Sequence, residues 1–253
     1  MPAFKDHFSK QSKAYGEFRP QYPQALYEYL SGICSSGHEL VWDCATGTGQ
    51  AARGLSGYFD NIIATDASAQ QIASAAGPEN VTFRVALAEG SGLDSASVDL
   101  VTVAQALHWF DLSVFYDEVK RVLKPKGILA VWTYDLLKIE DKIDGIIEKF
   151  NDDIIGEYWP AERQLVRDRY RKLSFPFNER GLTASSPEFN MTAQWSLDDL
   201  MGYLATWSSV AAYKDVRNKD PLREIYADLC AAWGVSSDKK DVKWPLSLRI
   251  GRI

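Results

Sequence analysis

Cysteine is scarce in this chain of 253 residues, and its placement argues against a disulfide framework or a zinc site. The three cysteines, Cys34, Cys44 and Cys230, are an odd number, and no two of them form a C-x-x-C pair. Disulfide-rich secreted domains and structural zinc sites need paired or closely spaced cysteines. We therefore expect three reduced, buried cysteines and no metal site.

Long apolar runs and an excess of positive charge are also absent. The first residues contain no apolar core of signal-peptide length, and no segment reaches the length of a membrane span. The net charge of -6 argues against nucleic acid as a bulk partner, but it leaves room for a locally basic pocket. We expect a cytoplasmic protein with no nucleic-acid or membrane partner. No heptad repeat indicates an oligomer, so both a monomer and a homodimer remain open.

The residues that are present suit a globular fold, because 46% are hydrophobic and 25% are charged. Up to residue 134, β-branched segments alternate with helical ones, a pattern typical of a doubly wound, mostly parallel α/β sheet with helices on both faces. A helix is expected with Pro23 near its first turn and Leu26, Tyr29, Leu30 and Ile33 on its apolar face, and further helices are expected at 50–56, 68–76 and 111–123. Strands are expected at 39–43, 61–65, 81–85, 98–104 and 128–132.

The pattern changes after residue 134. Residues 138–172 read as mainly helical, 175–187 as loop, 197–213 and 221–233 as two helical stretches, and 189–195 and 241–253 as strands. Pro245 suits a sheet edge or the start of a strand. The simplest assembly is a seven-stranded sheet that ends in an antiparallel hairpin and carries a helical cap. We divide the chain at residue 134, with an N-terminal arm and core at 1–134 and the cap with the last two strands at 135–253. The substrate site is expected between cap and sheet.

A tight glycine turn follows the first expected strand. Gly47 and Gly49 let the backbone pass close to a ligand, and free N–H groups at the start of the next helix favour a negative group there. Residues 47–52 also fit the loose G-x-G-x-x-A dinucleotide fingerprint. Asp43, before the turn, would repel a pyrophosphate but attract the ammonium of an amino-acid ligand, directly or through water. Asp66 ends the next strand, where an acid can accept both ribose hydroxyls of an adenosine.

The turn and Asp66 together resemble the class I methyltransferases that depend on S-adenosylmethionine (SAM), and the resemblance is strong over residues 39–134. Residues 98–106 resemble the strand beside the methionine part of SAM, and 123–127 the turn before the fifth strand. Ala45 departs from the pattern, since the family usually has glycine there. The resemblance implies SAM as the cofactor. It assigns cofactor contacts to Tyr15, Asp43, Ala45, Gly47, Gly49, Gln50, Asp66, Ala67, Ala88, Glu89 and Gln105.

Further segments resemble a narrower branch of that family, the one containing trans-aconitate methyltransferase. The segments are 15–23, 105–110, 203–208 and the C-terminal 244–252, so the resemblance extends over nearly the whole chain. Together with the acidic composition, this branch makes a small carboxylic acid our first candidate for the methyl acceptor. An ionised carboxylate needs no general base, whereas a phenol, alcohol or amine would benefit from one.

Two residues are candidate catalytic groups. His108 follows the fourth strand. Three roles are open for it, namely a general base, a hydrogen-bond partner for a substrate carboxylate, and a structural residue beside Trp109. Arg19 is placed to hold a carboxylate bidentately, and the alternative is an ordinary Arg-Pro turn on a surface arm. The candidate pocket walls are aromatic, although helical spacing by default means core packing. They are Trp109, Tyr203 and Trp207.

Several cofactor assignments also have a structural reading. Asp66 stands at a helix start, Glu89 is a loop charge, and Gln105 caps a loop if it does not line the methionine pocket. Two other functions remain open at this point. An NAD-dependent oxidoreductase shares the glycine turn and Asp66, but Asp43 and the order of later segments argue against it. The second of these functions is a non-catalytic scaffold of the same fold, and the intact glycine turn argues against that function.

Overall fold

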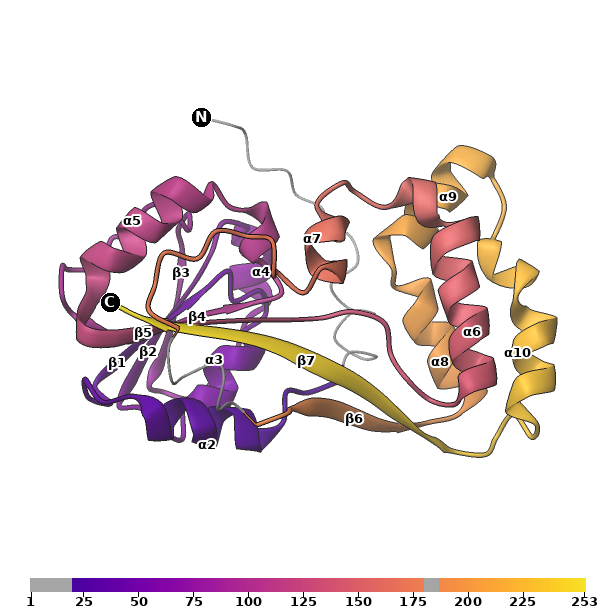
Figure 1. The fold of residues 1–253 in the computed structure, drawn as a ribbon, viewed down its shortest axis with the longest axis horizontal. Helices are drawn as coiled ribbons and strands as arrows, with labels where there is room; N and C mark the ends of the chain where they lie inside the picture. Colours follow the sequence, from indigo (N-terminus) through magenta and orange to yellow (C-terminus); the bar gives the residue numbers. More distant parts are fainter. Residues whose placement is uncertain (1–19, 180–186) are drawn as a thin grey trace.

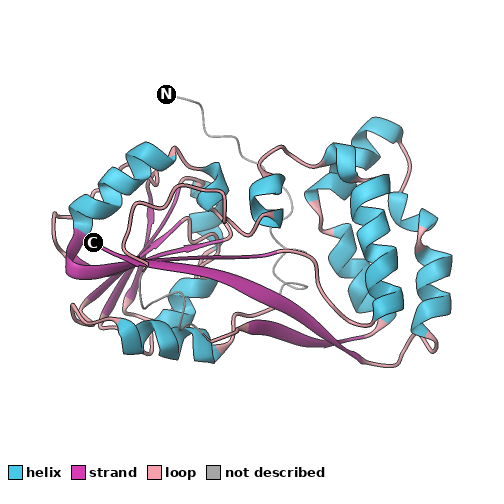
Figure 2. Cartoon of the chain, in the orientation of Figure 1, coloured by secondary structure: helices cyan, strands magenta, loops and turns pink. Residues whose placement is uncertain are grey.

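The sheet has seven strands in the order β3-β2-β1-β4-β5-β7-β6 (Figures 1 and 2). The computed structural model describes residues 20–179 and 187–253. β1 to β5 run parallel, and β7 pairs antiparallel with both β5 and β6. The predicted doubly wound sheet with a C-terminal antiparallel hairpin is therefore confirmed. The strands are β1 Leu40–Cys44, β2 Asn61–Asp66, β3 Val81–Val85, β4 Val98–Ala104, β5 Leu123–Tyr134, β6 Asn190–Trp195 and β7 Lys240–Arg252.

The direction in which the chain adds strands to the sheet changes between β1 and β4. From β1 the chain first builds outward through β2 to β3, and then returns to add β4 and β5 on the other side. Loops that leave two neighbouring strands in opposite directions open a crevice at the carboxyl ends of those strands. The glycine turn follows β1, and the segment with His108 follows β4. Both therefore border the crevice where such sheets bind ligands.

Helices cover both faces of the sheet. On one face, α2 and α3 pack against alternate strand residues such as Val41 and Leu100. On the other face, α5 packs against the residues next to these, such as Trp42 and Val101. The alternation follows the two-residue period of a strand. The core helices are α2 Gln24–Ile33, α3 Gln50–Leu55, α4 Ala69–Ser74, the 3₁₀ turn η2 Leu107–Trp109 and α5 Leu112–Val122.

The segment 123–127 is part of a strand and not a turn before it. We expected the fifth strand to begin at residue 128, but α5 ends at Val122 and β5 begins directly at Leu123. Two features let the strand start early. The register shifts between Val98 and Leu100 on the partner strand, and Lys126 has a φ of 69°. An irregularity of this kind absorbs the Pro-Lys-Gly sequence without ending the pairing.

Pro245 lies inside β7, a long strand with two partners. The two partners of β7 divide it between them. Residues up to Pro245 pair with β6, and those from Leu246 onward pair with β5. A proline cannot donate to a sheet ladder, so the changeover between partners accommodates it. The expectation of a sheet edge or strand start is replaced by this junction.

The cap is a group of helices at one end of the molecule, reached by the long β5 and β7 strands (Figure 1). Residues 197–213 form two helices and not one, because the chain turns at Thr206 and Trp207. A separate apolar cluster, including Phe150, Trp207 and Trp244, holds the cap together. No described helix is both long and apolar enough to cross a membrane. The cap elements are α6 Asp141–Lys149, η3 Phe150–Ile154, η4 Gly156–Tyr158, α7 Arg163–Arg167, α8 Leu197–Ala205, α9 Ser208–Arg217, η6 Pro221–Glu224 and α10 Tyr226–Trp233.

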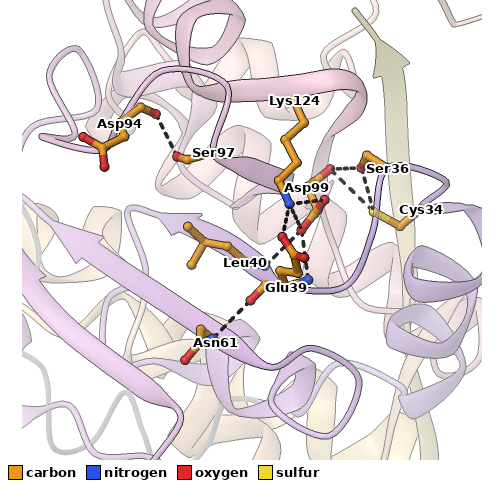
Figure 3. A network of polar contacts seen from close by, with 9 residues as sticks. All are labelled: Cys34, Ser36, Glu39, Leu40, Asn61, Asp94, Ser97, Asp99 and Lys124. Carbon is orange, nitrogen blue, oxygen red and sulfur yellow. Dashed lines mark hydrogen bonds and ion pairs between the residues drawn. The ribbon is translucent and has the colours of Figure 1, made fainter.

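A buried carboxylate joins three strands at the amino ends of the sheet (Figure 3). Asp99 has no exposed surface, and its Oδ2 accepts hydrogen bonds from the backbone N–H groups of Glu39 and Leu40 at 2.9 and 3.0 Å. Lys124 Nζ lies 3.0 Å from Asp99 Oδ1. Asp99 thus ties the starts of β1 and β5 to β4. Because the glycine turn lies at the other edge of the sheet, this network supports the fold and does not touch the site.

Candidate functional site

The glycine turn leaves open space in front of the backbone. Gly47 has a φ of 57° and Gly49 one of 89°, which favour glycine. A Cβ on Gly49 would lie 2.6 Å from the Phe83 ring, so packing also requires glycine there. A Cβ on Gly47 would meet no atom of the described chain within 4 Å. Gly49 therefore shapes the turn against the sheet, and Gly47 keeps the side toward the crevice free for a ligand.

Ala45 shares the left-handed backbone conformation of the two glycines, with a φ of 55°. An L-residue in this region costs about 1–2 kcal/mol relative to its preferred conformations. Glycine, which the family usually has there, would avoid that cost. The turn keeps its left-handed conformation at this position although the residue is alanine. Thr46 helps to hold it, because its backbone N–H donates to Thr65 O at 2.9 Å.

Asp43 is buried beneath the turn. Hydroxyl groups of Thr46 and Thr102 donate to its two oxygens, the latter at 2.8 Å. Burial raises its pKa to about 6, although the two hydroxyl hydrogen bonds act in the opposite direction. The carboxylate therefore braces the turn from behind, between β1 and β4. Contact with a ligand ammonium stays a prediction.

The raised pKa of Asp43 predicts a pH-dependent stability. The ordinary pKa of 3.8 applies in the unfolded chain, so the folded state prefers the protonated form. Its contribution is complete below about pH 4 and is lost as the pH rises through 6. We expect the free energy of unfolding to fall by about 1–2 kcal/mol more in the wild type than in Asp43→Asn between pH 5 and pH 8.

Urea unfolding of both proteins at the two pH values measures this difference. Asp60→Asn is the control, because Asp60 is exposed and stands just before β2. It should follow the wild type at both pH values. If the difference in the free energy of unfolding between the wild type and Asp43→Asn does not change with pH, the buried carboxylate does not titrate in this range.

Asp66 connects the turn to the next helix. Its Oδ2 accepts a hydrogen bond from Gly47 N at 2.9 Å, and its Oδ1 accepts one from Ser68 N at 2.8 Å. The side chain is half-buried at the end of β2, next to the carboxyl end of β1. Ala67 lies half-buried between the two contact points. The structure thus brings Asp66 and Ala67 to the glycine turn, and their contact with the cofactor stays a prediction.

The remaining predicted cofactor residues have contacts of their own around the crevice. Ala88 is buried, and Glu89 Oε1 accepts a hydrogen bond at 3.0 Å from the backbone N–H of Asp111, which caps α5. Gln50 Nε2 donates to Pro20 O at 2.9 Å, so it ties the start of α3 to the segment before α2. Tyr15 and Arg19 lie outside the described residues, and their assignments stay predictions.

Gln105 is held by the end of β5. Its backbone has a φ of 56°, its N–H donates to Trp132 O, and its Nε2 donates to Tyr134 O at 2.9 Å. The hydroxyl of Thr133 donates to its Oε1. Both ends of the amide are therefore used between β4 and β5. This geometry matches the loop-capping alternative, and a contact with the methionine part of SAM stays a prediction.

His108 lies on η2 and is held in place by Tyr170. Its Nδ1 shares a hydrogen bond of 2.7 Å with the Tyr170 hydroxyl. Burial and, to a smaller extent, the charge of Arg163 lower the pKa of His108 to about 3. Burial also raises the pKa of Tyr170. Both groups are therefore neutral at physiological pH, and His108 is a weak base.

Tyr170 reaches His108 from a strained turn after α7. Arg169 and Tyr170 have φ values of 54° and 57°, which L-residues rarely adopt. Arg249 on β7 stabilises the turn, because its Nη1 donates to Tyr170 O at 2.7 Å and to Leu173 O at 2.9 Å. Backbone strain that is held by its surroundings often accompanies a functional constraint. Here it positions the Tyr170 hydroxyl at Nδ1 of His108.

The three predicted aromatic residues lie at different depths. Trp109 is half-buried beside His108, with ring centroids 4.6 Å apart. Tyr203 and Trp207 are 2% and 4% exposed and belong to the apolar cluster of the cap. Tyr203 Oη accepts a hydrogen bond from Trp244 Nε1 at 3.2 Å. Trp109 therefore borders the crevice, whereas Tyr203 and Trp207 pack inside the cap. Contact of these three residues with a substrate stays a prediction.

Sequence reasoning missed a charged group next to His108. Arg163, the first residue of α7, pairs with Asp135 and lies over the Trp159 ring at 4.9 Å. Asp135 follows directly after β5. The sequence predicts only a mainly helical segment over 138–172, because no motif marks Arg163. In Figure 1, α7 lies between the sheet and the other cap helices.

Comparison with known proteins decides the family. A family model described as a methyltransferase domain matches residues 42–131. A protein of Dictyostelium discoideum named as a methyltransferase is 38% identical, over 98% of this chain and 95% of its own length. This chain is a SAM-dependent methyltransferase. A solved structure of a type II methyltransferase from Anaeromyxobacter dehalogenans superposes with a TM-score of 0.86, at 38% identity, covering 92% of this chain and 97% of that one.

A second relative agrees over most of the methyltransferase. A protein of Saccharomyces cerevisiae named as a SAM-dependent methyltransferase is 24% identical, covering 85% of each chain. These comparisons replace the two alternatives that the sequence left open, an NAD-dependent oxidoreductase and a non-catalytic scaffold. The cofactor is SAM, and the open side of Gly47 gives it room beside the turn. Within residues 20–179 and 187–253, no group of acidic, His or Cys side chains is placed to hold a metal ion.

Proposed function

We propose that this methyltransferase transfers the methyl group of SAM to an oxygen of a small-molecule carboxylic acid. The observation that carries the proposal is the placement of His108, whose Nδ1 is engaged with the Tyr170 hydroxyl at 2.7 Å. Burial and the charge of Arg163 also lower its pKa to about 3, which leaves it poorly suited to deprotonate a phenol, an alcohol or an ammonium group. A carboxylate is ionised at neutral pH and brings its own nucleophilic oxygen. The acceptor that best suits this site therefore needs no base.

The cofactor set proposed from the sequence fits this reading. SAM supplies a methyl group that is activated as part of a sulfonium. The glycine turn offers open space beside Gly47, and the Asp66 carboxylate lies beside the turn, where it would accept the ribose hydroxyls. Ala88 and Glu89 would border the adenine. Asp43 supports the turn from behind, so the site is preorganised before the ligand arrives.

Positioning is the main task that remains for the protein. Displacement at a methyl carbon requires the attacking oxygen in line with the breaking C–S bond, so the acceptor carboxylate would have to be held in that line near the ends of β4 and β5. Trp109 is half-buried beside His108 and would shield this space from water. The likeness of residues 15–23 and 105–110 to the branch containing trans-aconitate methyltransferase also supports a carboxylic acid. Tyr15 over the cofactor and Arg19 on a carboxylate remain parts of the proposal.

Methyl transfer from radiolabelled SAM to a panel of acceptors tests the proposal. Small mono-, di- and tricarboxylic acids form one group, and phenols, alcohols and amines of similar size form the other. We expect labelled product only from the acids. The product should release its label as volatile methanol in alkali, because methyl esters hydrolyse and methyl ethers or amines do not. Alkali-stable product from the second group alone would overturn the carboxylate proposal.

A further inference from the structure

We infer that Arg163 is the residue that recognises the carboxylate of the acceptor, and that Asp135 holds the guanidinium until the acceptor displaces it. The inference rests on the proposed carboxylate acceptor. It adds a specificity-determining ion pair that no sequence motif marks. Three observations support it, namely a buried donor, the placement of Arg163 beside His108, and its exchangeable partner.

The buried donor is Arg163 Nε. Within the part of the chain that the structure describes, this atom is shielded from solvent and has no hydrogen-bond partner. A buried donor on a charged group is costly to leave without an acceptor. A guanidinium presents its Nε–H and one Nη–H as a fork that matches the two oxygens of a carboxylate. The free Nε–H is therefore one half of a carboxylate receptor.

The place of Arg163 suits an acceptor. α7 packs against η2, and the charge of Arg163 is close enough to His108 to lower its pKa. Its partner Asp135 is the first residue after β5, at the carboxyl edge of the sheet. Cys44 at the end of β1 and Val131 on β5 are level across β4, about 10 Å apart, and β5 runs on for three more residues to Tyr134. The charge of Arg163 acts on His108, which follows β4, so an acid on Arg163 would face the same carboxyl edge of the sheet as the glycine turn.

The exchangeable partner is Asp135. Its carboxylate pairs with Arg163 Nη2, and the two side chains are 29% and 17% exposed. A carboxylate of the acceptor makes the same kind of contact, so it competes with Asp135 for the same cation. Trp159 lies against the guanidinium and packs on Trp207, which fixes the plane of the fork. Exchange of one carboxylate for another keeps the buried cation neutralised throughout.

Steady-state kinetics on the acid that gives most alkali-labile product tests the inference. We expect Arg163→Gln to raise the KM for that acid about 10- to 100-fold, because it removes a charge-assisted pair of hydrogen bonds. Arg163→Lys keeps the charge but not the fork, so it should recover only part of the loss. Asp135→Asn removes the competitor and should lower the KM. The affinity for S-adenosylhomocysteine should stay within about twofold in all three, which also shows that they fold.

The matched control is Arg167→Gln. Arg167 lies on the same helix, but it is exposed and pairs with Asp152 away from the crevice. It should leave both the KM and kcat unchanged. A direct readout is the Arg163 Nε–H signal in proton–nitrogen NMR, assigned by its loss in Arg163→Gln. It should move downfield with the acid and not with the amide of that acid.

The outcomes separate the two proposals. If Arg163→Gln keeps the wild-type KM while the product remains an alkali-labile ester, then the inference is wrong and the carboxylate acceptor stands. If the wild type makes only alkali-stable product, both are wrong. An Asp135→Asn variant whose KM rises as far as that of Arg163→Gln would show that Asp135 orients the arginine, which overturns the displacement step.

Discussion

Asp66→Ala should weaken the binding of S-adenosylhomocysteine about 100-fold, close to 3 kcal/mol. The carboxylate ends β2 beside the glycine turn, and it is proposed to accept two ribose hydroxyls through charge-assisted hydrogen bonds. Alanine also leaves the Gly47 N–H without its acceptor, so the turn loses a brace. Isothermal titration of the purified variant gives the dissociation constant, and circular dichroism shows whether it is folded.

Two further titrations separate the ribose contact from the brace. Asp60→Ala removes an exposed carboxylate just before the same strand, and it should bind as the wild type does. An S-adenosylhomocysteine analogue that lacks both ribose hydroxyls should bind the wild type weakly, and it should lose little more in Asp66→Ala. If the analogue loses as much as the natural ligand does on substitution, Asp66 acts only by shaping the turn. Unchanged affinity in a folded Asp66→Ala would exclude both roles.

Local signals in the sequence were enough to predict the sheet and the turn. Strands such as 98–104 combine β-branched residues with a buried, apolar pattern, and glycines at positive φ mark the turn. These signals act between neighbours in the chain. These local signals fail where the structure of a segment depends on how it pairs with a distant strand. The early start of β5 depends on a register shift with β4, and Pro245 is tolerated because β7 changes partner there.

For the same reason, the sequence predicted some residues of the candidate site and missed others. Asp66 and the glycines follow a fixed spacing, so their motif places them together. The pair of Arg163 and Asp135 forms across 28 residues, through the path of a helical segment that has no motif. Tyr203 and Trp207 were weighed as pocket walls or core, since helical spacing cannot tell which side faces a cavity. Burial in the cap places both in its apolar cluster.

Asp99→Ala should lower the free energy of unfolding by about 3–5 kcal/mol, because it removes one partner of a buried ion pair. Asp99 has no exposed surface, and Lys124 is only 20% exposed. The substitution leaves that ammonium group and the N–H groups of Glu39 and Leu40 without their shared acceptor (Figure 3). Urea unfolding followed by circular dichroism measures the loss. Asp99→Asn keeps the shape and an acceptor oxygen but not the charge, so it should lose less.

The nearby Asp94→Ala provides the matched control. Asp94 is exposed five residues earlier, and only its backbone oxygen accepts a hydrogen bond in this network, from Ser97 (Figure 3). Its loss should change stability by less than about 0.5 kcal/mol. Lys124→Met in the Asp99→Ala background should restore part of the stability, since it removes an ammonium group that then has only the exposed Glu39 carboxylate as its partner. The network lies at the amino ends of the strands, so the folded fraction of each variant should bind S-adenosylhomocysteine as the wild type does. A loss below 1 kcal/mol for Asp99→Ala, or a change in affinity without one in stability, would contradict this purely structural role.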